Sequence, residues 1–178
     1  YGNPVNNVTV SFTADNGAVV TTASAVTDAS GLASTTLSNT TSGTTNIVAA
    51  VNGTNQNVNI NFAPDDSTAT IINGNLVVTQ NNAKANGTDS NKVQATVTDA
   101  NGNRVPNTTV TFAADNGATV ITTSVTTDAQ GLAEAALTNV KAGDTKVTAT
   151  VNGNSQNVTT TFAADDSTST ITRSNFTV

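Results

Sequence analysis

The amino-acid sequence contains few residues whose types could support catalysis. It has neither histidine nor cysteine, so it lacks the side chain that titrates near neutral pH and the thiol used for nucleophilic or redox chemistry. Serine and threonine are abundant, but no activating base accompanies them in a recognisable pattern. The adjacent carboxylates Asp65–Asp66 and Asp165–Asp166 are the only pairs that could share acid–base work. We therefore predict that the protein is not an enzyme.

The same two pairs are candidate metal ligands. Calcium is bound in proteins by about six to eight oxygen atoms, and sites in extracellular modules supply them from carboxylates and carbonyls. Each pair is expected where one module ends and the next begins, and Asp89, Asp99 or Asn101 could approach in the fold. The alternative is a solvated linker turn. We predict no cofactor, and we keep calcium at Asp65, Asp66, Asp165 and Asp166 as a hypothesis to be tested.

Three further aspartates are each followed by glycine in a pattern typical of tight turns. The stretch "TDASGLASTTL", residues 27–37, returns as "TDAQGLAEAAL", residues 127–137. The aspartate side chain can accept hydrogen bonds from N–H groups just after it, and the glycine can adopt the left-handed conformation that ends the turn. We predict structural turns at Asp28–Gly31, Asp99–Gly102 and Asp128–Gly131. Leu32 and Leu37, like Leu132 and Leu137, are then expected to re-enter the core.

The composition favours strands and excludes binding to polyanions. Of the 178 residues 36% are hydrophobic and only 10% charged, and the β-branched and turn-forming residues that fill the rest suit short strands with tight turns. The net charge is −6 and the six Lys and Arg residues are scattered. The attraction that drives nucleic-acid binding is therefore absent, and an anionic membrane surface would repel the chain. We predict no nucleic-acid partner and no direct membrane contact.

The sequence repeats itself at an interval of 100 residues, and this repeat defines the domain organisation. Residues 2–78 align with residues 102–178 without a gap, and about half of the positions are identical. We predict a partial repeat in residues 1–66 that lacks its first strands, a complete repeat in residues 67–166, and the first strand of a further repeat in residues 167–178. Because the chain begins with Tyr1 rather than methionine, we expect it to be a segment of a longer protein.

Short alternating stretches predict a β-sandwich. Apolar and polar residues alternate in Val93–Val97, Val110–Phe112, Val147–Val151 and Val158–Phe162. Residues 67–72 and 76–80 are expected to form a split first strand. About seven or eight short strands, with a turn every 8–12 residues, are typical of an antiparallel sandwich. The predicted fold class is all-β. The residues expected in its core include the phenylalanines that recur in register with the repeat: Phe12, Phe62, Phe112 and Phe162.

The partial first repeat has a consequence for assembly. It has no counterpart of residues 68–101, so a sandwich built from residues 1–66 would expose its core and leave open strand edges. One interpretation is a truncated array of repeats. The other is that the tail strand of one chain completes the first repeat of the next chain, which would produce a filament.

Two long stretches carry a resemblance to a known family. They are "VQATVTDANGNRVPNTTVTFAADNGA", residues 93–118, and "TTDAQGLAEAALTNVKAGDTKVTATVNG", residues 126–153. With their repeated counterparts they resemble the first group of bacterial immunoglobulin-like domains, which build the extracellular stalks of intimin, invasin and related outer-membrane adhesins. The resemblance covers essentially the whole chain, although Arg104 stands where the family often has proline.

The resemblance implies tandem immunoglobulin-like antiparallel β-sandwiches in an elongated array. It implies an extracellular position on the bacterial cell surface, with anchoring in the outer membrane through a region outside this sequence. The implied function is a structural stalk segment that projects a distal binding tip. The implied partners are neighbouring repeats of the same chain and, through a distal domain, a host-cell receptor. The alternative is an adhesive module that itself binds host protein or glycan, or that self-associates through strand complementation.

Overall fold

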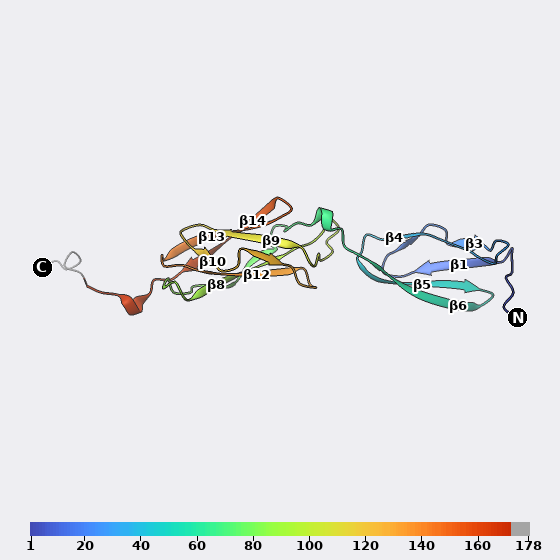
Figure 1. Ribbon diagram of the computed structural model, residues 1–178, viewed down its shortest axis with the longest axis horizontal. Helices are drawn as coiled ribbons and strands as arrows, with labels where there is room; N and C mark the ends of the chain where they lie inside the picture. Colours follow the sequence, from blue (N-terminus) through green and yellow to red (C-terminus); the bar gives the residue numbers. More distant parts are fainter. Residues whose placement is uncertain (172–178) are drawn as a thin grey trace. The chain divides into compact units, whose positions relative to one another are not determined.

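A computed structural model describes residues 1–171 as an all-β protein, which confirms the predicted fold class. The chain divides into two compact units, unit 1 (Tyr1–Pro64) and unit 2 (Asp65–Val178), drawn in blue to teal and in green to red in Figure 1. This division falls between Pro64 and Asp65, whereas the predicted boundary follows Asp66. Of the segment predicted to open a further repeat, residues 172–178 lie outside the described residues. Within the described part, no helix is long and apolar enough to cross a membrane.

Unit 2 is an antiparallel sandwich of two four-stranded sheets. One sheet has the strand order β10-β12-β8-β7 and the other β11-β9-β13-β14. The strand bounds are β7 (Leu76–Gln80), β8 (Ser90–Thr96), β9 (Thr109–Ala114), β10 (Thr119–Val120), β11 (Ser124–Thr126), β12 (Leu132–Thr138), β13 (Gly143–Val151) and β14 (Asn154–Phe162). The longest antiparallel pairings are β12 with β8 in the first sheet and β13 with β14 in the second.

The core of unit 2 follows from the alternation of its strands. Successive side chains of a strand point to opposite faces of the sheet, and every second residue of β8, β12 and β13 is buried. Phe112 and Phe162 are buried as predicted. The apolar core residues that these strands contribute from both sheets are Val93, Ala95, Ala133, Ala135, Leu137, Val147, Ala149 and Val151.

The prediction for the leucines is half wrong. Leu137 is fully buried, but Leu132 is only partly buried and lies on the opposite face of β12 from Ala133. The two leucines are five residues apart, and an odd separation in a strand places side chains on opposite faces. Leu32 of unit 1 is exposed. The small residues between the leucines, and not Leu132, therefore fill this part of the core.

The first half of the predicted split strand is not a strand. Residues 66–68 form the 3₁₀ turn η1 (Asp66–Thr68), and only Thr70 bridges to another segment, at Thr98. Ala69 and Ile71 are nevertheless almost completely buried. The same turn recurs as η2 (Asp166–Thr168). The segment therefore contributes to the core through two side chains without pairing along its length.

Unit 1 repeats part of this architecture. Its larger sheet has the order β3-β1-β5-β6, and β2 pairs with β4 alone. The bounds are β1 (Thr9–Ala14), β2 (Val19–Val20), β3 (Ser24–Val26), β4 (Leu37–Ser38), β5 (Gly43–Val51) and β6 (Thr54–Phe62). With the repeat interval of 100 residues, β1, β5 and β6 correspond to β9, β13 and β14.

The second sheet of unit 1 is incomplete. Unit 1, which is described throughout, has no counterpart of β7 or β8. In unit 2, β12 pairs with β8 over seven residues. Unit 1 lacks the counterpart of β8, and β4, which corresponds to β12, has only two residues. Phe12 and Phe62 are only half-buried, whereas Phe112 and Phe162 are 3% and 1% exposed. The core of unit 1 is therefore open on the side where unit 2 carries β7 and β8.

Candidate functional site

The repeated Asp-x-x-Gly stretches form hydrogen-bonded turns. Oδ1 of Asp128 accepts hydrogen bonds from the backbone N–H groups of Gln130 and Leu132 at 2.8 and 2.9 Å. The N–H of Gly131 donates to the backbone carbonyl of Asp128. Asp28 makes the same contacts in unit 1. Because this carboxylate oxygen accepts two N–H groups of its own turn, the aspartate stabilises the local backbone conformation.

The glycine of this turn is required by both conformation and space. Gly131 has φ +70°, and a Cβ placed on it would lie 2.8 Å from the carbonyl oxygen of Val97 and 3.1 Å from the backbone N of Val105. Left-handed φ values are costly for residues with a Cβ. The backbone therefore passes so close to Gly131 that any side chain would displace the segment around Val97. Gly31 has φ +74° in unit 1.

The turn at Asp99 holds the beginning of unit 2. Oδ1 of Asp99 accepts from the N–H groups of Asn101 and Asn103, both at 2.9 Å. Oδ2 accepts from the Asn103 side-chain amide at 2.8 Å and from the N–H of Asp65 at 3.1 Å. Gly102 adopts φ +86° at the end of the turn. One carboxylate thus closes its own turn and binds a segment 34 residues earlier in the chain.

The pKa of Asp99 reflects these contacts. Burial works to raise the pKa of this carboxyl, but the hydrogen bonds from Asn103, from the N–H of Asp65 and from the N–H of Asn101 outweigh burial and hold the pKa below its ordinary value. Hydrogen bonds to the charged form favour that form. Asp99 is therefore ionised at neutral pH and acts there as a hydrogen-bond acceptor.

Further hydrogen bonds secure the same segment. The N–H of Ala100 donates to Oγ1 of Thr68 at 3.2 Å. The side-chain amide of Asn152, in the β13–β14 turn, donates to the carbonyl oxygens of Asp66 and Ala69 at 3.1 and 3.3 Å. The first residues of unit 2 are thus bound by both the Asp99 turn and the β13–β14 turn.

The residues after β14 are bound in a similar way. The N–H of Ala163 donates to the carbonyl of Ala83 at 2.9 Å, and the N–H of Ala85 donates to the carbonyl of Ala163 at 2.8 Å. Asn91, which is fully buried, accepts from the N–H of Ala83 and donates to the carbonyl of Thr161, both at 2.9 Å. The chain therefore leaves β14 along a segment that the β7–β8 connection holds in place.

Lys84 adds an ion pair at this end. Its Nζ lies 2.6 Å from Asp166 and 3.6 Å from Asp165. The hydrogen bond with Asp166 raises the pKa of Lys84 and lowers the pKa of Asp166. The pKa of Asp165 is lowered first by the hydrogen bond from the Ser167 hydroxyl, with Lys84 contributing less. Asp166 is largely exposed, so solvent screens this pair strongly.

The two Asp-Asp pairs have the same local geometry. Oδ1 of Asp65 accepts from the N–H and hydroxyl of Ser67, as Oδ1 of Asp165 does from Ser167. In residues 1–171 no group of three or more acidic side chains comes together as a metal-binding set. Calcium at Asp65, Asp66, Asp165 and Asp166 stays a prediction. Its oxygen ligands would have to include backbone carbonyls or water.

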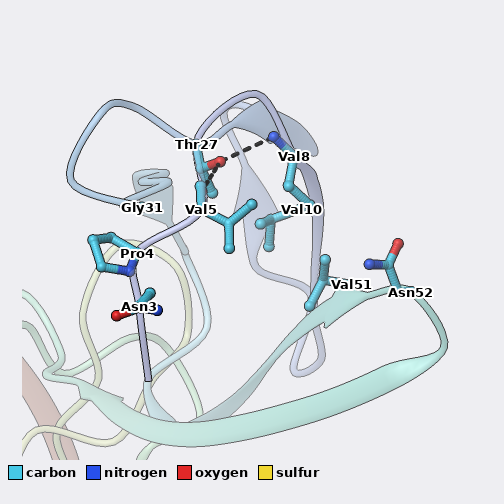
Figure 2. A pocket seen from close by; sticks show the side chains of 9 residues that line it. All are labelled: Asn3, Pro4, Val5, Val8, Val10, Thr27, Gly31, Val51 and Asn52. Atoms are coloured by element: carbon cyan, nitrogen blue, oxygen red, sulfur yellow. Dashed lines mark hydrogen bonds between the residues drawn. The ribbon is translucent and has the colours of Figure 1, made fainter. Parts of the chain in front are cut away.

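A cavity of about 400 Å³ opens in unit 1. Figure 2 shows the side chains of Val5, Val10 and Val51 gathered at this cavity, beneath Thr27. Their counterparts in unit 2, Val105, Val110 and Val151, are at most 2% exposed. The lining is completed by Asn3, Pro4, Val8, Thr27, Gly31 and Asn52.

Residues 1–63 and 73–163 match the family of bacterial Ig-like domains (group 1). The chain belongs to this family. The resemblance inferred from the repeated motifs is thereby confirmed, and both units contribute to the match.

Similar proteins support an immunoglobulin-like fold for these group 1 domains. The inverse autotransporter adhesin YeeJ of Escherichia coli (strain K12) is 36% identical over an alignment of 114 residues, and the match covers 57% of this chain and 4% of that protein. The chain thus spans a very small part of this relative. InvD of Yersinia pseudotuberculosis superposes with a TM-score of 0.69 at 20% identity, over 96% of this chain and 52% of the other. The Escherichia coli adhesin FdeC gives 0.68 at 20% identity, over 92% and 55%.

Buried polar residues of the group 1 domains were missed by the sequence patterns. The hydroxyl of Thr127 donates to the carbonyl of Val105 at 2.8 Å and accepts from the N–H of Thr108 at 2.9 Å. Thr27 makes the equivalent bonds in unit 1. Threonine before aspartate in both copies of the "TD" stretch was the available signal. Because threonine is also abundant on exposed strand faces, residue type alone did not distinguish these two buried positions.

Proposed function

We propose that this chain is a stalk segment of a bacterial cell-surface adhesin of the intimin and invasin type. Tandem Ig-like modules would hold a distal binding tip away from the cell. Family membership and the 100-residue repeat support a modular spacer, and the relative YeeJ is an inverse autotransporter adhesin. The scarcity of titratable groups near neutral pKa fits a role without catalysis.

The observation that carries the proposal is the binding of both ends of unit 2 into its fold. A stalk module under tension is loaded where the chain enters and leaves it. In unit 2 the first residues are held by Asp99 and Asn152, and the residues after β14 are held by Ala83 and Ala85. Such contacts would have to break before the two ends of unit 2 could peel away from its sheets.

The position and partners of the chain follow from this role. We place it on the extracellular side, anchored in the outer membrane through a region outside this sequence. Its direct partners would be neighbouring repeats, and a distal domain would bind the host-cell receptor. Contact with nucleic acid or with the membrane is not part of the proposal, because the chain carries a net charge of −6.

A surface-display assay tests the spacer role. The 178-residue chain is displayed on a bacterial outer membrane, alone and with a short peptide epitope at its far end, beside an anchor that lacks the chain. We expect the displayed chain to leave attachment to host cells at the level of the bare anchor while making the epitope more accessible to antibody. Attachment conferred by the chain alone would refute the pure spacer role and favour the alternative of a directly adhesive module.

A further inference from the structure

Strand β6 is an unprotected edge of unit 1. It is the last strand of the sheet β3-β1-β5-β6 and lies beside β5 in Figure 1. Its nine residues pair with β5 without a bulge, and they include no charged residue and no proline. Proteins usually protect edge strands with lysine, proline, a bulge or a very short strand. Because β6 has none of these features, its free side is suited to pairing with another strand.

Unit 2 shows which backbone groups of this edge are free. There the N–H of Asn82, outside the sheet of β14, donates to the carbonyl of Thr161 at 3.1 Å, so the backbone groups of Thr161 point away from β13. Residues two apart in an antiparallel strand direct these groups to the same side. By the repeat interval of 100 residues, the N–H and carbonyl groups of Asn55, Asn57 and Asn59 point away from β5.

This free edge does not depend on the segment that opens a repeat. In unit 2 residues 67–100 are present, and the connection between β7 and β8 bonds to β14 only at Thr160 and Thr161. Within the described residues, the backbone groups of residues 155–159 that face away from β13 have no partner. The side chains, and not the opening segment, therefore distinguish β6 from β14 along this stretch.

The outer face of β6 carries a single residue type. Asparagine occupies every second position, and all four side chains are exposed: Asn55, Asn57, Asn59 and Asn61. Any antiparallel pairing of β6 with a second β6 through these residues places asparagine opposite asparagine. An amide side chain both donates and accepts hydrogen bonds, so two facing asparagines can bond to each other. The strand is therefore self-complementary, as a two-fold interface requires.

A bond of this kind already exists on the same face. Nδ2 of Asn46, on β5, donates to Oδ1 of Asn59 at 2.8 Å, and the two residues lie directly opposite each other in the register of β5 and β6. Rows of asparagine amides also accompany the stacking of identical strands in other assemblies. The row that begins at Asn46 can thus continue through β6 into a second copy.

The face of β14 is less suited to self-pairing. There β13 places Asp144 and Lys146 beside β14, whereas the corresponding positions of β5 are uncharged. The hydroxyl of Thr148 donates to Oδ1 of Asn157 at 2.7 Å, so this amide is engaged within unit 2. Residues 1–64 hold only two charged side chains, both aspartates, and two copies of unit 1 therefore approach each other with little repulsion.

We propose that β6 is a self-association edge, at which two copies of this chain pair antiparallel about a two-fold axis at Asn57. Asn57 faces Asn57 of the second copy, and Asn55 faces Asn59. These pairs exchange about six backbone hydrogen bonds, two for each pair, and join two four-stranded sheets into one. The pairing does not require the adhesin role.

Two features set the register and the strength of this contact. The register uses the three free residues and leaves out Asn61, whose counterpart Thr161 is bound by the β7–β8 connection in unit 2. One strand from each copy buries less than the roughly 1,200 Å² typical of stable complexes. The association is therefore weak and depends on concentration.

Sedimentation equilibrium of the 178-residue chain between about 10 μM and about 1 mM tests the proposal. We expect the average mass to rise from that of a monomer toward that of a dimer. Hydrogen exchange locates the contact. When half of the chains are paired, the amides of Asn55, Asn57 and Asn59 should exchange about twofold more slowly than in dilute solution. The amide of Val58 faces β5 in both states and should be unchanged.

A pair of matched variants identifies the strand. Asn57→Lys places two ammonium groups opposite each other on the axis and should abolish the rise in mass. Asn157→Lys, the same change on β14, should leave the rise as it is in the parent chain. Both side chains are exposed, so both variants should fold. Asn57→Glu should also stay monomeric, but an equimolar mixture of Asn57→Lys and Asn57→Glu should associate again, because ammonium then faces carboxylate.

Three results would overturn the proposal. The first is a mass that stays that of a monomer at every concentration. The second is association that persists in Asn57→Lys or that Asn157→Lys removes equally, since another surface would then be responsible. The third is a mixture of the two Asn57 variants that does not associate, because residue 57 would then not face its own counterpart across the axis.

Discussion

Replacing Gly131 by alanine should destabilise unit 2 by more than its backbone conformation alone requires. A residue with a Cβ at a left-handed φ costs about 1–2 kcal/mol. At Gly131 the new Cβ would also lie 2.8 Å from the Val97 carbonyl oxygen, so the segment around Val97 must move. That movement strains two buried hydrogen bonds, from Val97 to Gly131 and from Val105 to Val97, each worth about 1 kcal/mol. The expected loss is therefore about 3–4 kcal/mol.

Gly153 provides the matched control. It has φ +79°, and no atom lies within 4 Å of a Cβ built on it. Gly153→Ala should therefore cost only the conformational part, about 1–2 kcal/mol. Asparagine, which tolerates left-handed φ better, should be nearly harmless at Gly153 but still damaging at Gly131, where the Cβ itself is the obstacle. Valine at Gly131 should be worse than alanine, because a β-branched side chain is an outlier at positive φ.

Thermal unfolding measures the difference in stability between the two alanine variants. Hydrogen exchange of β8 and β12 assigns the transition to unit 2. For a domain of this size, 1 kcal/mol corresponds to roughly 4 °C or more in the unfolding midpoint. Gly131→Ala should lower the midpoint by about 12 °C or more, and Gly153→Ala by about half of that or less. Equal shifts for the two alanine variants would show that the close approach of Val97 has no energetic importance.

Four further predictions concern the polar contacts of unit 2. Because the folded pKa of Asp99 is depressed, its contribution to stability is present above its ordinary pKa and is lost as pH falls through the folded value. Asp99→Asn should therefore flatten this loss of stability at acid pH in pH-dependent melts. At neutral pH the variant should cost about 1–3 kcal/mol, because the NH₂ group of the new side chain would face the N–H of Asp65. Thr127→Val removes both hydrogen bonds of a buried hydroxyl and should cost about 1–3 kcal/mol in denaturant unfolding, while the exposed neighbour Thr126→Val should stay within about 0.5 kcal/mol of the parent. Lys84→Ala should lower the melting midpoint slightly at low ionic strength and not at about 1 M salt; an effect that persists in high salt would contradict a screened surface pair. The calcium hypothesis predicts a midpoint that rises with millimolar calcium and falls again with a chelator, and an unchanged midpoint would dismiss the site.

Local features of both units were predictable because each depends on a few neighbouring residues. The turns at Asp28 and Asp128 need an aspartate acceptor and a glycine within one short stretch. The alternation in β8 and β13 needs only the two-residue period of a strand. Leu132 shows the limit of such reasoning, since apolar character alone did not say which face of β12 would be covered. Counting the two-residue period of a strand from Leu137 places Leu132 on the opposite face of β12.

The sequence by itself determined the all-β class, the 100-residue module and the family, because the repeat places turn residues and apolar positions in register. Only the tertiary structure decided how the two ends of unit 2 are held. Lys84 and Asp166 are 82 residues apart, and Asn152 and Asp66 are 86 residues apart. Such pairs meet only after the sheets have packed, so no local pattern encodes them. The open face of unit 1 has the same origin, since its valines become exposed or buried according to whether a distant segment lies against them.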